Sequence, residues 1–164
     1  GLDVKTNDVI GLSQRGGTIW GSVKMGEKIH SPNIAPGDAD ILIAFEKLES
    51  KRWKHMLKQK DSIAIINEYE IAPTLVQQGD KEYPEDVLEN MKQKSEVISL
   101  DATATGAKMG NPAIANILLL GIAARYMDIS VETWFKTFEQ YLPAKFVELN
   151  KKAFMYGYEQ EYLK

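Results

Sequence analysis

The chain has 164 residues and a formal net charge of −3 at pH 7. Its 44% hydrophobic and 26% charged content is that of an ordinary folded globular protein. Its acidic balance argues against nucleic-acid binding, which normally needs a basic surface. Because the sequence contains no cysteine, the chain can form no disulfide and can supply no thiolate ligand to an iron–sulfur cluster. The length predicts one domain across residues 1–164, and the lack of cysteine suits a cytoplasmic protein.

Five short segments carry the pattern of β-strands. Residues 2–9 and 18–25 are predicted to be strands, and apolar and polar side chains alternate in the second of them. This alternation should leave one face exposed or covered by a partner. Residues 41–45, 63–66 and 97–100 are almost continuously apolar, which is typical of strands in a sheet covered on both faces.

Helical patterns lie between and after these buried strands. Residues 48–57 separate the first two, and residues 84–94 precede the third, with Pro84 at a position that suits the first helical turn. The alternation of strand and helix predicts an α/β fold. We expect a three-layer α/β/α sandwich around a mostly parallel, or mixed, sheet.

The chain is predicted to be helical from Asp101 to its end. Its longest apolar stretch, residues 113–124, is too short to span a membrane and predicts a buried helix. Residues 131–142 and 146–156 follow the helical period, and Ser130 is the expected N-cap of the first of these two helices.

One glycine-rich loop is a candidate binding element. It consists of Ser13, Gln14, Arg15, Gly16 and Gly17. Two adjacent glycines allow a backbone or an anion to approach closely, and the planar guanidinium of arginine suits a carboxylate or a phosphate. The alternative, and the more common reason for glycines before a strand, is simple turn chemistry.

A polar residue follows each of the three buried strands. These residues are Glu46, Asn67 and Asp101. If the strands are parallel, the three side chains emerge at one edge of the sheet, where open α/β sheets bind ligands. Arg15, backbone N–H groups and Asn67 could then form a cradle for a carboxylate or a phosphate. The alternative is that these residues cap the helices that follow them.

No residue is assigned a catalytic or metal-binding role. The two histidines, His30 and His55, have no neighbouring acid at metal-ligand spacing. The sequence also has no phosphate-binding P-loop, no nucleophile elbow and no complete dinucleotide-binding fingerprint. We therefore predict that the chain itself binds no metal and no cofactor.

Further motifs follow the glycine-rich loop in a definite order. They are SPNI at 31–34, GDAD at 37–40, EKLE at 46–49, GDKEYP at 79–84, GNP at 110–112 and FVELNKKAF at 146–154. With the loop at 13–17, they make nearly the whole chain resemble the small subunit of indolepyruvate ferredoxin oxidoreductase. More broadly, the chain resembles the gamma-type domain of the 2-oxoacid:ferredoxin oxidoreductases. Members of that family usually carry a strand and a glycine-rich loop well before the SQRGG run, so we expect this sequence to lack that N-terminal βα unit.

This resemblance implies a cytoplasmic enzyme subunit that is inactive alone. The assembly would oxidatively decarboxylate a 2-oxoacid, with indolepyruvate or another arylpyruvate as substrate, and form an acyl-CoA, carbon dioxide and reduced ferredoxin. Thiamine diphosphate and the iron–sulfur clusters are then expected on a large partner subunit. Coenzyme A and ferredoxin would be met through the assembly. An isolated chain could form homodimers.

Two other classes of protein stay open on the sequence. One is a stand-alone α/β module that binds a small ligand or a nucleotide without catalysis, and the other is a structural domain that only holds a partner. An obligate subunit should expose a large apolar patch at Trp20, at residues 68–83 or on the C-terminal helices. A self-sufficient binder should instead show a deep, closed pocket near Arg15.

Overall fold

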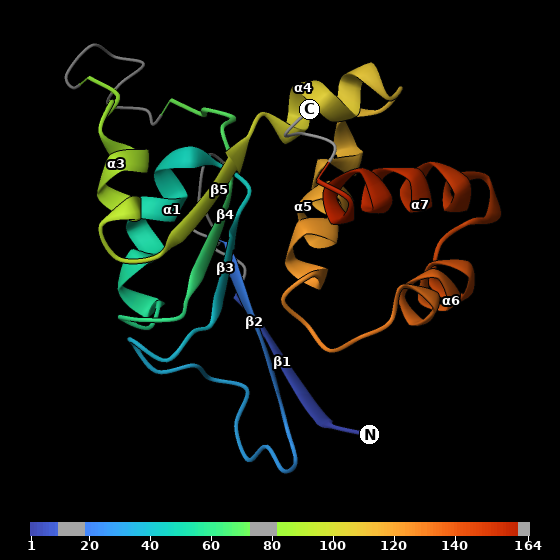
Figure 1. Cartoon of the computed structure of the whole chain (residues 1–164), viewed down its shortest axis with the longest axis horizontal. Coiled ribbons are helices and arrows are strands. Elements are labelled where there is room, and N and C mark those ends of the chain that lie inside the picture. The colour runs from blue at the N-terminus through green and yellow to red at the C-terminus, as the bar shows by residue number, and fades with distance from the viewer. Residues whose placement is uncertain (10–18, 73–81, 161–164) are drawn as a thin grey trace.

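The computed structural model describes residues 1–9, 19–72 and 82–160. In chain order the elements are β1 (Asp3–Val9), β2 (Trp20–Gly26), β3 (Ile41–Ala44), α1 (Lys47–Trp53), the 3-10 helix η1 (Lys54–Met56), β4 (Ile63–Asn67), α3 (Val87–Lys92), β5 (Glu96–Leu100), α4 (Ala102–Lys108), the 3-10 helix η2 (Pro112–Ile114), α5 (Ala115–Ala124), α6 (Val131–Tyr141) and α7 (Ala144–Tyr158). Figure 1 shows α1 and α3 on one side of a central sheet and α5 on the other, with α6 and α7 beyond α5. The predicted α/β fold is confirmed.

The central sheet consists of three parallel strands in the order β3-β4-β5. Ile63 of β4 is in register with Ile41 of β3 and with Glu96 of β5. Every residue of β4 is buried, as expected for a middle strand that is covered on both faces. The three continuously apolar segments are therefore strands, as predicted.

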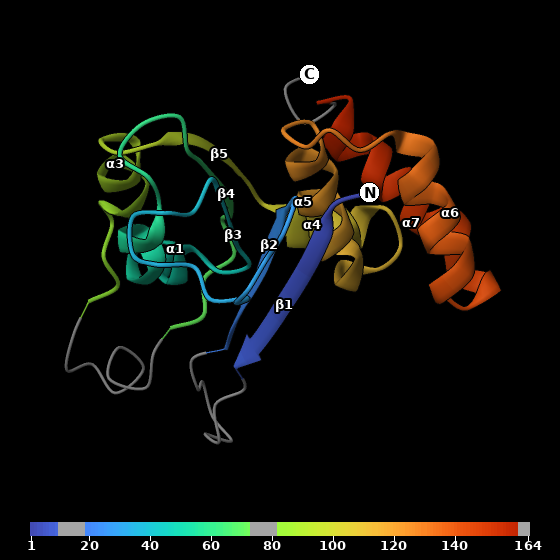
Figure 2. The same ribbon diagram turned by 90° about the horizontal axis from the view of Figure 1, so that it is seen from below.

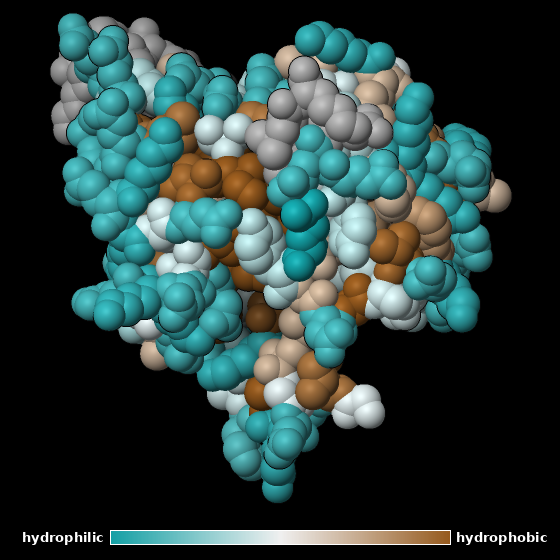
Figure 3. Space-filling model, viewed as in Figure 1, coloured by the Kyte–Doolittle hydropathy of each residue, from teal (hydrophilic) through white to brown (hydrophobic). Residues whose placement is uncertain are grey.

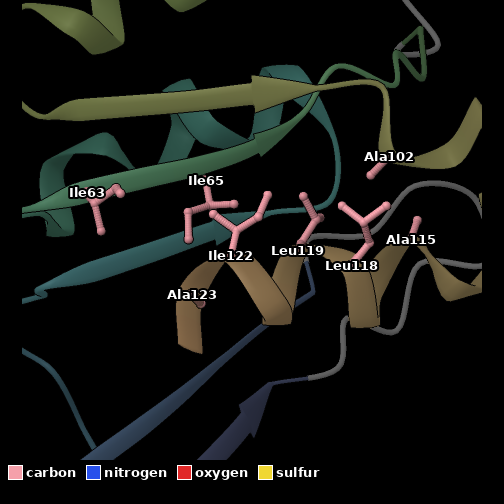
Figure 4. Close-up of a cluster of buried hydrophobic side chains, with 8 residues drawn as sticks. All are labelled: Ile63, Ile65, Ala102, Ala115, Leu118, Leu119, Ile122 and Ala123. Carbon is pink, nitrogen blue, oxygen red and sulfur yellow. The ribbon is translucent and has the colours of Figure 1, made fainter. Parts of the chain in front are cut away.

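Each face of this sheet packs against its own apolar layer. On one face, Ile63 and Ile65 point toward Leu118 and Ile122 of α5, as Figure 4 shows. On the other face, Ala64 and Ile66 of β4 pack in a cluster with Met91 of α3. Strand β4 thus supplies both cores by the simple alternation of its side chains.

Strands β1 and β2 form a separate antiparallel hairpin, so both predicted N-terminal strands are confirmed. Val4 pairs with Met25 and Val9 pairs with Trp20. The Trp20 ring lies 5.2 Å, centroid to centroid, from the ring of Trp53 in α1. This aromatic contact packs the hairpin against helix α1.

Two predicted helices differ in detail from the structure. The helix expected over 48–57 ends as α1 at Trp53 and continues as the 3-10 helix η1. The helix expected from Pro84 begins only at Val87, because residues 85–86 form a turn and Asp86 is the N-cap. Pro84 therefore lies before the helix and not in its first turn.

The C-terminal helices agree with the prediction. The Ser130 hydroxyl accepts a hydrogen bond from the Thr133 amide at 3.3 Å and caps α6. Helices α5 and α7 cross so closely that a Cβ atom added at Gly121 would overlap the Phe154 carbonyl oxygen. No helix in the described ranges has both the length and the apolar character needed to cross a membrane.

Candidate functional site

The three strand-end residues lie at the same edge of the central sheet. Asn67 ends β4, Asp101 follows β5 directly, and Glu46 comes just after β3. Because the three strands are parallel and adjacent, their carboxyl ends meet at this edge. The expected juxtaposition is therefore confirmed, and we call this region the carboxyl edge.

Asn67 joins the three strand ends. Its side-chain nitrogen donates to the carbonyl oxygen of Phe45 at 3.1 Å and to the Thr103 hydroxyl at 2.9 Å. Its side-chain oxygen accepts the Ala102 backbone N–H at 3.0 Å. The buried amide thus holds both neighbouring strand–helix junctions, and its oxygen and nitrogen are both already engaged.

Glu46 is a buried carboxylate with three donors. Its oxygens accept the Glu49 amide at 2.9 Å, the Ile71 amide at 3.2 Å and the Tyr83 hydroxyl at 2.6 Å. The first bond caps α1, and the other two attach residues on either side of the segment 72–82. Burial, and then the bond to the Glu46 carboxylate, raise the pKa of the Tyr83 phenol.

Asp101 caps α4. Its carboxylate accepts the Ala104 amide at 2.7 Å, and the side chain is otherwise exposed. Two of the three candidates are therefore helix caps, the alternative that the sequence left open. Carboxylates at Glu46 and Asp101 would repel an anion. An anion-binding site at this edge therefore needs a positively charged residue in addition to these three.

Lys47 and Tyr83 are edge residues that sequence reasoning did not select. Lys47 pairs with Glu70 at 2.6 Å, and its ammonium nitrogen lies 5.7 Å from the centroid of the Tyr83 ring. The EKLE and GDKEYP motifs contain these two residues, but their spacing along the chain gives no sign that the fold brings them together. They meet only because Tyr83, in the connection between β4 and α3, packs against the start of α1.

The glycine-rich loop comes between β1 and β2 in the sequence. Ser13, Gln14, Arg15, Gly16 and Gly17 all lie outside the described residues. Their predicted role in anion binding stays a prediction.

A hollow of about 640 Å³ lies at the opposite edge of the sheet, where the strands begin. Among its lining residues are Asp61, Ser62, Lys92 and Lys94. Asp61 adopts a left-handed backbone conformation with φ 57°, which is uncommon for a residue other than glycine. The hollow is open to solvent and mixes charges of both signs. An open hollow of this kind is not the closed pocket that a self-sufficient binder should show.

Metal-ligand groupings are absent from the described part of the chain. No set of three or more His, Cys, Asp and Glu side chains there could hold a metal ion. His30 and His55 are both exposed, and the His55 ring stacks on Trp53 with the centroids 6.0 Å apart.

Comparison with known proteins places this arrangement in a family. Residues 1–160 match the family described as pyruvate ferredoxin/flavodoxin oxidoreductase. The chain belongs to this family. The resemblance read from the sequence motifs is therefore confirmed.

Two relatives of this chain are named indolepyruvate oxidoreductase subunit IorB. The protein from Archaeoglobus fulgidus is 31% identical over 98% of this chain and 81% of its own length. The protein from Pyrococcus horikoshii is 28% identical over 96% of this chain and 80% of its own length. The relatives are thus subunits of oxidoreductases.

Solved structures of the family share the fold. The gamma subunit of a keto/oxoacid ferredoxin oxidoreductase from Geobacter sulfurreducens has a TM-score of 0.68 and 21% identity, covering 99% of this chain and 82% of its own. The pyruvate oxidoreductase subunit PORC from Thermotoga maritima has a TM-score of 0.63 and 20% identity, covering 96% and 79%. The 2-oxoglutarate:ferredoxin oxidoreductase from Magnetococcus marinus has a TM-score of 0.70 and 17% identity, covering all of this chain but 26% of its own.

Proposed function

We propose that this chain is the small subunit of a cytoplasmic 2-oxoacid:ferredoxin oxidoreductase with indolepyruvate or a related arylpyruvate as its substrate. The assembly would release the carboxylate carbon as carbon dioxide, transfer the acyl group to the sulfur of coenzyme A and pass the electrons to ferredoxin. The observation that carries this proposal is the 31% identity to a subunit named for indolepyruvate, over 98% of the chain. Residues 1–164 would act as one gamma-type domain.

The residues of the chain do not fit the redox cofactors of such an enzyme. Iron–sulfur clusters are held mainly by cysteine thiolates, and the sequence has no cysteine. The family resemblance implies that thiamine diphosphate is held by the larger subunit of such an enzyme. We assign both cofactors to that large partner subunit, and we assign no proton-transfer or nucleophilic step to this chain.

The contribution of this chain would be to shape a ligand approach at the carboxyl edge. Asn67, Glu46 and Asp101 fix the strand–helix junctions there through their hydrogen bonds. Arg15, with its neighbours in the glycine-rich loop, would supply the positive charge that these residues lack. The phosphates of coenzyme A and the carboxylate of a 2-oxoacid are both anions that arginine binds well.

The test is isolation of the full-length protein from its native host under anaerobic conditions, followed by identification of every protein that comes with it. The same fraction is assayed for coenzyme-A-dependent reduction of ferredoxin with arylpyruvates, pyruvate and 2-oxoglutarate. We expect a large, brown, thiamine-containing partner and a preference for arylpyruvates.

Two results would contradict the proposal in different ways. A colourless protein without a partner or activity would remove the subunit assignment and favour a free-standing binding module. An active complex that prefers pyruvate or 2-oxoglutarate would keep the subunit assignment but overturn the substrate class.

A further inference from the structure

Strand β5 forms a free edge of the central sheet. In the sheet order β3-β4-β5, it has a neighbouring strand on one side only within the described part of the chain. At the start of β5, the Glu96 amide donates to the Ser62 carbonyl oxygen at 3.1 Å. At its end, the Leu100 carbonyl oxygen accepts the Glu68 amide at 2.9 Å. The first and last residues of β5 therefore direct these backbone groups toward β4.

The N–H and C=O groups of Val97 and Ser99 point away from the sheet. A strand turns the backbone groups of alternate residues to opposite sides, and residues 96 and 100 face β4. Among the described residues, no hydrogen bond reaches these four outward groups. Figure 3 shows apolar surface where Figure 1, in the same view, places β5. An uncovered edge of this kind is a template for another strand.

This edge lies on the side of the sheet away from the N-terminus. Figures 1 and 2 both show β4 and β3 between β5 and the β1–β2 hairpin. A βα unit that precedes residue 1 would join the chain at this hairpin, on the β3 side of the sheet. The sequence led us to expect an exposed patch at Trp20 of the hairpin, but that side chain is half-buried against Trp53. The free edge of β5 is thus the better candidate for an interface.

We propose that two copies of this chain pair antiparallel through β5, so that their sheets become one continuous sheet. A two-fold axis at Ile98 is the register that pairs all five residues of one β5 with all five of the other. It places Val97 of one copy opposite Ser99 of the second, and each such pair exchanges two backbone hydrogen bonds. All four outward groups of each copy are then satisfied. This inference does not depend on the proposed function.

The charges at the two ends of β5 favour a second copy as the occupant. Lys92 and Lys94 come just before the strand, which makes this end basic. Asp101 follows the strand, and Glu68 lies beside that end because its carboxylate accepts the Ser99 hydroxyl at 2.7 Å. In an antiparallel pair, the basic end of each β5 meets the acidic end of the other. Opposite charges therefore face each other on both sides of the two-fold axis.

Ile98 lies on the proposed axis and supplies the apolar contact. Its side chain packs against the core cluster that Ile65 forms with Leu118 and Ile122 of α5. Opposite it would stand Ile98 of the second copy, a cross-strand pair of β-branched side chains that stabilises a sheet. Five residues at about 3.3 Å each make a contact only about 17 Å long. We therefore expect a reversible dimer whose population depends on protein concentration.

The test introduces single cysteines into the full-length chain, because residues 1–164 contain none. Val97→Cys and Ser99→Cys are made as separate variants. In the proposed register, position 97 of one copy and position 99 of the other have Cα atoms about 5.5 Å apart, which a disulfide can bridge. Two copies of the same variant have these Cα atoms about 8 Å apart, which is too far. Tyr141→Cys, at a side chain that is 74% exposed on α6, is the control for chance collisions.

We expect the mixture of Val97→Cys and Ser99→Cys to form a disulfide-linked dimer at least fivefold faster than either variant alone. Peptide mass spectrometry should identify the bridge between positions 97 and 99. The thermal midpoint of each variant, compared with that of the wild type, checks its folding. Tyr141→Cys should dimerise no faster than the unmixed edge variants.

A second measurement needs no substitution. Exchange of the Val97 and Ser99 amide protons with solvent should be at least fivefold slower at high than at low concentration of the wild-type chain. The Ile98 amide faces β4 in the ladder and should exchange slowly at both concentrations.

Three results would overturn the inference. If the mixture bridges no faster than the single variants, two copies do not pair in this register. If the Val97 and Ser99 amides are protected equally at every concentration, a segment of the chain itself covers the edge. If they become protected only when a different subunit is bound, that subunit is the occupant. None of these results bears on the proposed function, which depends on the co-purified partner and its activity.

Discussion

The side-chain amide of Asn67 donates to the carbonyl oxygen of Phe45 at 3.1 Å, a hydrogen bond that joins the end of β4 to the residue just after β3. The oxygen of the same amide accepts the Ala102 N–H, just after β5. One buried residue on the middle strand therefore sets the positions of both neighbouring strand ends. A ligand at the carboxyl edge would therefore contact segments whose first residues are held by the Asn67 side chain.

Replacement of Asn67 by alanine should destabilise the chain. It removes three hydrogen bonds and leaves the Ala102 N–H and the Phe45 carbonyl without this partner. Unsatisfied buried groups cost about 1–3 kcal/mol each, so we expect the free energy of unfolding to fall by about 3 kcal/mol. Asn116→Ala, on the exposed side of α5, is the control: it removes one exposed hydrogen bond, from the Ile117 amide, and should lower the free energy of unfolding by no more than about 1 kcal/mol. Equal effects of the two substitutions in urea unfolding would show that Asn67 does not hold the edge.

Tyr83 should make the chain less stable at alkaline pH. Burial and the bond to the Glu46 carboxylate raise the pKa of its phenol, so the folded chain holds this proton more tightly than the unfolded chain. The protonated phenol therefore makes its full contribution to the free energy of unfolding below about pH 10, the pKa of an unfolded tyrosine. That contribution is lost as the pH rises above this value. The phenol is only half-buried, so the loss should be smaller than the limit of about 1.4 kcal/mol per pH unit.

The matched variant is Tyr83→Phe, which cannot ionise. Urea unfolding at about pH 9 and about pH 11 should show a smaller decrease in stability for Tyr83→Phe than for the wild type, since other groups titrate equally in both. Deprotonation of lysines also lowers the free energy of unfolding at high pH, but it does so equally in both proteins and cancels in the comparison. An identical decrease in the two proteins would mean that the pKa of the Tyr83 phenol is not raised in the folded chain.

Much of the fold could be predicted from local patterns. Continuous apolar runs indicated three strands, because a middle strand such as β4 is buried on both faces. The serine at 130 indicated a helix start, because its hydroxyl satisfies a free backbone N–H. The start of α3 was wrong by three residues. Proline fits the first turn of a helix, but it equally fits the extended chain before one, and the sequence does not distinguish the two.

Less of the site could be predicted, because it depends on contacts between distant segments. Strand-end positions indicated that Glu46, Asn67 and Asp101 would share an edge. Nothing local showed that Tyr83 returns to Glu46, 37 residues away in sequence. The alternation of apolar and polar side chains along β2 also did not predict which side of the hairpin is exposed. That choice depends on the packing of Trp20 against Trp53.

The close crossing of α5 and α7 determines whether alanine at Gly121 stabilises or destabilises the chain. In an unobstructed helix, alanine in place of glycine stabilises by roughly 0.5–1 kcal/mol. At Gly121 the added Cβ would overlap the carbonyl oxygen of Phe154 on α7, and the backbone cannot yield cheaply. We therefore expect Gly121→Ala to destabilise the chain by at least about 2 kcal/mol in thermal or urea unfolding. A stabilised variant would mean that the two helices are further apart than the structure places them.

Arg15→Ala tests whether the glycine-rich loop contacts an anionic ligand in the assembled enzyme. Loss of a charge-assisted hydrogen bond costs about 1.5–3 kcal/mol, so the KM for coenzyme A or for the 2-oxoacid should rise about tenfold or more. Arg15→Lys keeps the charge but loses the planar fork and should lie between alanine and the wild type. Arg52→Ala, at the end of α1, is the control and should leave both KM values unchanged. If Arg15→Ala assembles normally and changes neither KM, the loop contacts no substrate, and the small subunit acts only as a scaffold.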